Sequence, residues 1–174
     1  MLPNANKSKI FLKIIAITVF ILYLSYLFYL TFFSHLYGRG YFHRSMNLVP
    51  FTTIQLFMAS GRIRGILVNV FGNIAAFIPM GVLFPLVFNK SVQLCRTLLI
   101  TFAVSLMIEI VQYAFGVGAA DIDDLMLNLT GGLAGYVIFM ALRALYRHIV
   151  RSRRTLAELP GPSPRSVRQG PTGA

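Results

Sequence analysis

Four long apolar runs constrain this 174-residue chain more than any other feature. A helix needs about 20 apolar residues to cross the hydrocarbon core of a bilayer. The runs cover roughly residues 14–33, 65–88, 97–115 and 125–146. Backbone polar groups find no water in lipid, so such segments form helices. The sequence therefore predicts an all-α integral membrane bundle of about four transmembrane helices, with one longer outer loop, residues 35–64, between the first two.

The composition agrees with a membrane domain. Only 12% of the residues are charged, against about 25% in ordinary soluble domains, and the mean hydropathy is +0.70. The formal net charge of +11 is interpreted as cytoplasmic tails that face anionic lipid headgroups. We therefore expect membrane lipids, and not nucleic acid, as partners of the basic residues.

The placement of lysine and arginine predicts the orientation. With four spans both termini lie on the same side, and that side receives twelve of the sixteen basic residues. The other side receives Arg39, Arg44, Arg62 and Arg64. Because basic residues gather in cytoplasmic loops, the sequence predicts a multi-pass cell-membrane protein with both termini in the cytoplasm.

The same reasoning divides the chain into three parts. Residues 1–13 form a cytoplasmic N-terminal segment, and residues 14–149 form the transmembrane domain. Residues 150–174 are rich in Arg, Pro, Gly and Ser, which is typical of a disordered basic cytoplasmic tail.

Polar residues in the apolar runs point to a site. Four of the five acidic residues lie within sixteen positions, from Glu109 to Asp124. A carboxylate at bilayer depth costs about 2.5–3.5 kcal/mol on insertion scales, so it is retained where the protein interior or a function holds it. The predicted orientation brings polar groups of three helices to one depth, in the outer half of the bilayer. They are Asn69, Asn73, Glu109, Gln112, Asp121, Asp124 and Asn128.

Within each helix these residues are spaced to share one face. Asp123 falls off that face and is expected to lie outside the site. Structural roles compete with function here, because acids in a first helical turn cap N–H groups and amides join helices by hydrogen bonds. Glu109 is too deep in its helix to cap anything, so a functional role is favoured for it.

No cofactor is predicted. The three histidines lie apart, without the spacing of zinc ligands, and none of the common catalytic motifs of soluble enzymes occurs. One alternative stays open, in which Asp121 and Asp124 hold a divalent cation such as Mg²⁺ or Ca²⁺, the ions that oxygen ligands suit.

Three blocks of sequence carry a family resemblance. The first runs from Arg44 to Ile54 and contains Asn47, and the second is N-V-F-G-N-I-A-A-F-I-P-M-G over residues 69–81. The third joins E-I-V-Q at 109–112 to D-I-D-D-L-M-L-N-L-T-G-G at 121–132. Together they resemble the VanZ-like family. The resemblance implies a membrane protein linked to resistance against teicoplanin-type antibiotics, without an established catalytic mechanism.

Two classes of function fit these residues. The first is a protein that binds or shields at the outer leaflet and meets a lipid-linked cell-wall precursor or the lipoglycopeptide itself. The second is an intramembrane enzyme that modifies a lipid-linked envelope precursor, with Glu109 as general base. A proton-coupled transporter is a third, weaker alternative, because four helices make a small transporter. The sequence assigns no catalytic residue and no oligomeric state.

The outer loop adds Arg44 and Asn47 to the candidate site. Four carboxylates and four arginines are expected on the outer side, and a buried charge needs a partner. The sequence therefore predicts that Arg44 folds over the site and pairs with Asp121 or Asp124.

Overall fold

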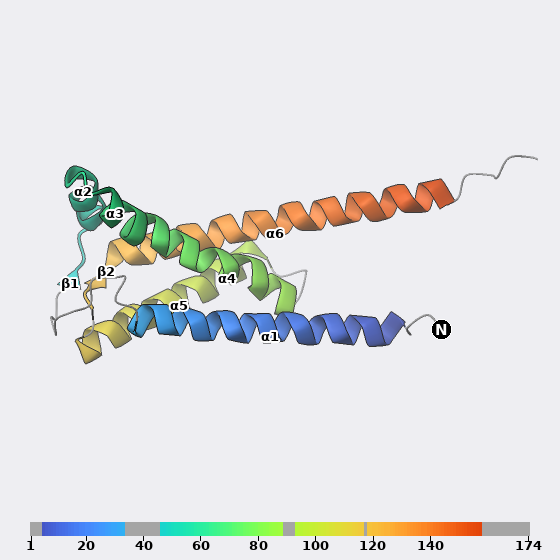
Figure 1. Ribbon diagram of the computed structural model, residues 1–174, viewed down its shortest axis with the longest axis horizontal. Helices are drawn as coiled ribbons and strands as arrows, with labels where there is room; N and C mark the ends of the chain where they lie inside the picture. Colours follow the sequence, from blue (N-terminus) through green and yellow to red (C-terminus); the bar gives the residue numbers. More distant parts are fainter. Residues whose placement is uncertain (1–4, 34–45, 89–92, 117, 158–174) are drawn as a thin grey trace, which may run out of the picture. The chain divides into compact units, whose positions relative to one another are not determined.

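A computed structural model describes residues 5–33, 46–88, 93–116 and 118–157. The chain divides into two compact units, Met1–Met140 and Ala141–Ala174, and the site lies in the first. The elements, labelled in Figure 1, are α1 (Ala5–Phe32), β1 (Met46–Asn47), α2 (Thr52–Ala59), α3 (Ile63–Ile66), the π-helical turn η2 (Leu67–Phe71), α4 (Gly72–Phe88), α5 (Leu94–Phe115), β2 (Ala120–Asp121) and α6 (Ile122–Ala157).

The predicted all-α membrane fold is confirmed. Four helical segments are long and apolar enough to cross a membrane, namely Ile10–Phe32, Ile63–Phe88, Leu94–Phe115 and Ile122–Ser152. All four begin a few residues earlier than the apolar runs. The reason is that polar residues at a helix end, such as Arg64 and Arg96, continue the helix without adding to its hydrophobicity.

The second span combines α3, η2 and α4 in one helix. Its π-helical turn contains Asn69, and the α-helix then continues through Pro79 and Pro85. The sequence predicts that both prolines disturb this helix, because each lacks a backbone donor. Short π-helical turns inside α-helices occur mostly as single insertions that shift the register of the side chains after them.

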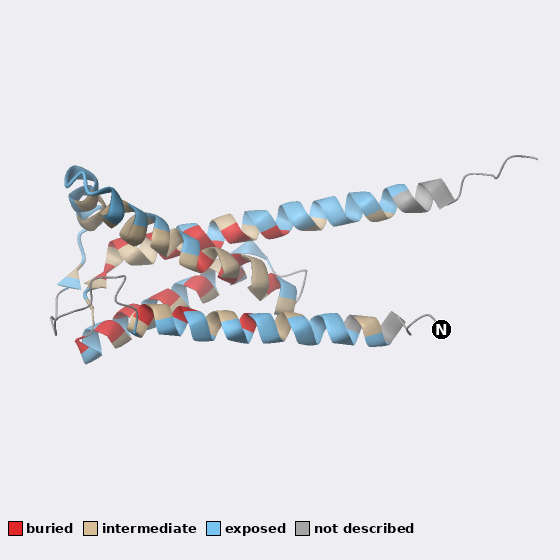
Figure 2. Cartoon of the chain, in the orientation of Figure 1, coloured by how far each residue is buried: buried red, intermediate tan, exposed pale blue. Residues whose placement is uncertain are grey.

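The helices of the first unit pack closely. Phe20 and Leu27 of α1 are buried against Phe77 and Met80 of α4, and the hydroxyl of Tyr23 donates to the carbonyl of Ala76 at 2.9 Å. Figure 2 shows buried residues along α5 and the first turns of α6.

Glycines allow α4 and α6 to approach each other. A Cβ added at Gly135 would fall on the carbonyl oxygen of Ile78, and one at Gly131 on that of Ile74. This is the close backbone contact that small residues permit in membrane bundles.

The chain forms a small polar cap at one end of this unit. There α1 and α5 end, α3 and α6 begin, and β1 pairs in parallel with β2, with Met46 opposite Ala120 and Asn47 opposite Asp121 (Figure 1). Helix α2 belongs to the same end. The sequence predicts this piece of the loop as too short to span and as lying along the interface or re-entering the membrane.

In the second unit, the described chain is the C-terminal part of α6. The helix continues to Ala157, so residues 150–157, which the sequence assigns to the disordered tail, are helical. Three of these eight residues are Arg, and the stretch ends in Leu and Ala, all of which are good helix formers.

Candidate functional site

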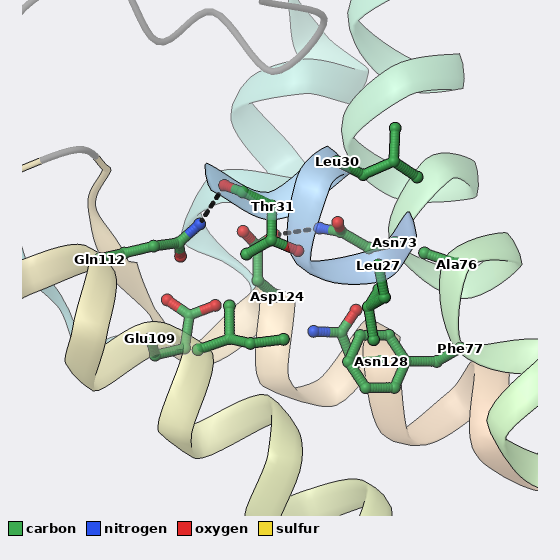
Figure 3. Close-up of a pocket in the computed structure, with 11 residues that line it drawn as sticks. Leu27, Leu30, Thr31, Asn73, Ala76, Phe77, Glu109, Gln112, Asp124 and Asn128 are labelled. Carbon is green, nitrogen blue, oxygen red and sulfur yellow. Dashed lines mark hydrogen bonds between the residues drawn. The ribbon is translucent and has the colours of Figure 1, made fainter. Parts of the chain in front are cut away.

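A small polar cavity lies between α1, α4, α5 and α6 of the first unit. Its volume is about 30 Å³, enough for a water molecule or two. Figure 3 shows polar side chains from all four helices around it. The polar lining residues are Thr31, Asn73, Glu109, Gln112, Asp124 and Asn128, and the apolar ones are Leu27, Leu30, Ala76, Phe77 and Ile108.

Helix α5 contributes Glu109 and Gln112, one turn apart, to this cavity (Figure 3). Glu109 is 6% exposed, and its Oε2 atom accepts a hydrogen bond from the backbone N–H of Asp121 at 2.9 Å. The Nε2 atom of Gln112 donates to the carbonyl of Thr31 at 3.4 Å. The two side chains therefore join α5 to the start of α6 and to the end of α1.

Two asparagines complete the polar lining. The Nδ2 atom of Asn73 in α4 donates to Oδ1 of Asp124 in α6 at 2.5 Å. The Nδ2 atom of Asn128 donates to the hydroxyl of Ser105 at 2.8 Å. Its Oδ1 atom is buried and accepts no bond from the described residues. In Figure 3 this oxygen lies among the residues that line the cavity, and it has almost no accessible surface.

Asp121 connects three segments of the polar cap. It immediately precedes α6, and its Oδ1 atom accepts the backbone N–H of Asp123 at 2.9 Å, which is the bond of a helix N-cap. The same oxygen accepts from Nδ2 of Asn47 at 3.0 Å. Its Oδ2 atom accepts from the hydroxyl of Thr53 at 2.5 Å. Among Asp121, Asp123 and Asp124, Asp121 is therefore the residue that caps α6.

Asp123 has a structural role that the sequence did not indicate. Its predicted place is off the shared face, and it does not line the polar cavity, but its side chain is completely buried. Its carboxylate accepts backbone N–H bonds from Phe51 at 2.5 Å, Thr53 at 2.8 Å and Ile54 at 3.1 Å. Asp123 therefore caps the N-terminus of α2, because Phe51 at the N-cap position of that helix has no side chain that can do so.

Asn69 does not join the other polar residues. Its Nδ2 atom donates to the carbonyl of Gly65, 3.0 Å away and one turn back on the same helix. Asn69 lies in the π-helical turn and Asn73 in the α-helix that follows it. Of the two asparagines predicted to share a stripe, Asn73 lines the polar cavity and Asn69 does not. Arg44 lies outside the described residues, so its predicted pairing stays a prediction.

Seven of the predicted residues are thus connected or line the same cavity: Asn47, Asn73, Glu109, Gln112, Asp121, Asp124 and Asn128. Sequence reasoning missed three hydroxyl residues that bond to them or line the cavity with them, Thr31, Thr53 and Ser105. A signal existed for Ser105, because Thr97, Thr101, Ser105 and Glu109 recur every four residues of α5 and all four are buried.

An apolar groove lies beside the polar cavity. Its volume is about 430 Å³ and the atoms that line it are apolar. Helix α5 supplies Leu106, Glu109, Ile110, Tyr113 and Ala114 to the groove, and β1, β2, α6 and the residues next to them supply Met46, Leu48, Ala120, Asp121, Ile122 and Leu125. Glu109 lines both the groove and the polar cavity.

The two candidate cation ligands lie on different sides of this arrangement. Asp121 lines the groove and Asp124 the polar cavity, and each accepts bonds from its own asparagine. Within the described ranges no group of three or more His, Cys, Asp or Glu residues is placed to hold a metal ion.

The four spans and the polar residues buried between them define a multi-pass α-helical membrane protein. The family model VanZ/LLP1 matches residues 20–143, so the chain belongs to this family. A similar protein is Protein VanZ of Enterococcus faecium, which is 34% identical over 131 residues, covering 73% of this chain and 74% of the relative. No solved structure matches the chain significantly.

Proposed function

We propose that this VanZ-like protein lowers susceptibility to teicoplanin-type lipoglycopeptide antibiotics by binding or shielding an amphiphile at the outer leaflet. The amphiphile is a lipid-linked cell-wall precursor or the lipoglycopeptide. The observation that carries the proposal is the position of Glu109, a residue that lines a polar cavity and an apolar groove at once.

This pairing of surfaces suits a ligand with a polar head and an apolar chain. The groove, at about 430 Å³, falls within the range of about 300–1,000 Å³ typical of small-molecule sites. Along α5 it follows a segment long enough to span a membrane, so a chain can enter from the surrounding lipid. The polar cavity has room for a water molecule or two, so only a single small polar group of the head would enter it.

The predicted orientation indicates on which side of the membrane the site lies. With both termini in the cytoplasm, the end of the bundle that carries Asp121 and Asp124 faces outward. Teicoplanin-type drugs act outside the cytoplasmic membrane on lipid-linked precursors. A site at this end is suitably placed for either ligand.

Binding is favoured over catalysis by the partners of the carboxylates. Asp121 caps α6 and Asp123 caps α2, so two of the four clustered acids are occupied in holding the backbone. The alternative is an intramembrane enzyme that modifies a lipid-linked envelope precursor. It requires Glu109 as a general base. If a divalent cation takes part, Asp121 and Asp124 must both coordinate that ion.

One experiment separates the two functions. The protein is purified with native membrane lipids, incubated with and without Mg²⁺, and the co-purified lipid is identified by mass spectrometry. We expect an envelope lipid that is retained unchanged and is lost from the Glu109→Gln variant. Retention should persist in Thr130→Val, which removes an exposed hydroxyl of α6. Chemical conversion of the lipid would select the enzyme, and equal retention by Glu109→Gln would reject the site.

A further inference from the structure

We infer that α2 and the residues on either side of it are immersed in the acyl chains of one leaflet, as a re-entrant element that does not cross the membrane. The large apolar side chains of this element point outward from the bundle. Their exposed fractions range from 51% to 72%, and they are Leu48, Val49, Phe51, Leu56, Met58 and Ile63. Figure 2 shows α2 largely as exposed surface.

The composition of the element suits hydrocarbon. Residues 47–61 contain no Lys, Arg, Asp or Glu, and an exposed apolar surface of this kind marks contact with a partner or a membrane. Two of its exposed polar side chains already have partners. The hydroxyl of Thr52 donates to the carbonyl of Val49 at 3.0 Å, and that of Ser60 donates to the carbonyl of Phe57 at 2.8 Å.

The N-terminus of α2 does not depend on water. The first N–H groups of a helix have no partner within the helix, and in lipid each unsatisfied group costs several kcal/mol. Here the carboxylate of Asp123 accepts the N–H groups of Phe51, Thr53 and Ile54. A fully buried acid from another helix therefore performs the task that water performs at the end of a surface helix.

The C-terminus of α2 is closed in a similar way. The carbonyl of Leu56 accepts from the N–H of Ser60 at 3.0 Å, and that of Met58 accepts from the N–H of Gly61 at 3.4 Å. The hydroxyl of Ser60 donates to the carbonyl of Phe57, which lies between Leu56 and Met58 in the chain. Gly61 has φ +61°, a left-handed conformation in which glycine closes a helix at little cost. Both ends of this eight-residue helix thus satisfy backbone groups without solvent.

Charge and continuity identify lipid as the partner. The element leads directly into the membrane span that begins at Ile63, and Arg62 and Arg64 stand at this junction. Arginines at the end of a span interact with anionic headgroups. Helix α2 folds back along this span, because a Cβ added at Gly65 would lie 3.1 Å from Cδ1 of Phe57. The outward face of α2 therefore lies beside the lipid-facing start of the span.

The inference adds a link between the bilayer and the polar site. Thr53 lies in the first turn of α2 and its hydroxyl donates to Asp121. If the apolar face of α2 holds this helix in the leaflet, the hydroxyl of Thr53 stays beside the carboxylate of Asp121. The same holds for Asn47, which precedes α2 and also donates to Asp121.

Tryptophan fluorescence tests the inference cleanly, since the chain contains no tryptophan. Leu56→Trp and Met58→Trp introduce a single indole on the outward face of α2. Phe57→Trp is the matched control, because Phe57 is half-buried against Gly65. Leu99→Trp, at an exposed apolar position of α5, reports contact with lipid on a spanning helix. Each full-length protein is reconstituted into phosphatidylcholine and phosphatidylglycerol vesicles with or without brominated acyl chains.

We expect the Leu56→Trp and Met58→Trp proteins to emit in the blue, to lose most of their emission in brominated vesicles as Leu99→Trp does, and to resist aqueous iodide. Phe57→Trp should lose less emission. Red emission with quenching by iodide would place α2 in water and overturn the inference. Blue emission that neither quencher reduces would mean that protein, such as a second copy of the chain, covers the face, and it would also overturn the inference.

Discussion

Asn47 and Asp121 are paired twice, through the backbone of the parallel β1–β2 ladder and through a side-chain hydrogen bond of 3.0 Å from Nδ2 to Oδ1. The two residues are 74 positions apart. Their contact attaches the segment before α2 to the start of α6, and Glu109 joins them by accepting the backbone N–H of Asp121. Hydrogen bonds therefore link the segment before α2, helix α5 and the start of α6 at this end of the bundle.

The cap on α2 should be a major source of stability for that end. Asp123→Ala leaves three N–H groups of α2 without their acceptor, and each buried donor left unpaired costs about 1–3 kcal/mol. We expect a lower unfolding temperature in detergent and faster hydrogen exchange in residues 51–59. Asp123→Asn retains one acceptor oxygen and should lose less. Unchanged exchange in α2 of the alanine variant would contradict the role of Asp123.

The charge of Glu109 should matter for function more than for folding. Glutamine keeps the size of the side chain and an oxygen that can accept the N–H of Asp121. We expect Glu109→Gln to reach the membrane at normal abundance, while teicoplanin susceptibility rises to that of cells without the protein. Thr130→Val is the control on α6 and should protect normally. If Glu109→Gln is missing from the membrane, the carboxylate is needed for folding, and the functional interpretation fails.

The contact between α4 and α6 should not tolerate a larger residue. A Cβ at Gly135 would strike the carbonyl of Ile78 and approach the Cα of Gly81 at 2.9 Å. Overpacking of this kind costs about 1–3 kcal/mol, so Gly135→Ala should lower the unfolding temperature. At Gly118 the nearest atom, Cδ of Gln112, is 3.4 Å from an added Cβ. Gly118→Ala should therefore change stability little, and an equal loss in both variants would argue against the contact.

The predicted orientation can be measured by cysteine labelling. In a Cys95→Ser background, a single cysteine at Ser45, in the predicted outer loop, should react with an impermeant maleimide in intact cells. A cysteine at Ser152 should react only after the cells are permeabilised. The reverse pattern would move the polar site to the inner leaflet and remove the basis of the proposed function.

Much of this architecture follows from local sequence patterns. Apolar runs of sufficient length predict four helices, and the spacing of Glu109 with Gln112, and of Asp124 with Asn128, predicts which side chains share a face. Asn69 shows the limit of this reasoning. Its spacing to Asn73 predicts a common face, but Asn69 lies in a π-helical turn and bonds to Gly65 of its own helix, while Asn73 lines the polar cavity.

The sequence alone determined the number of spans and the family, because hydrophobic length and motif spacing are read over short stretches of chain. Only the tertiary structure decided what each acid does. The carboxylate of Asp123 meets N–H groups some 70 positions earlier in the chain, and Asp121 meets Asn47 across 74. Such bonds depend on how the chain folds back on itself. Helical spacing separates Asp123 from the face of Asp124, but no local pattern indicates that Asp123 caps α2.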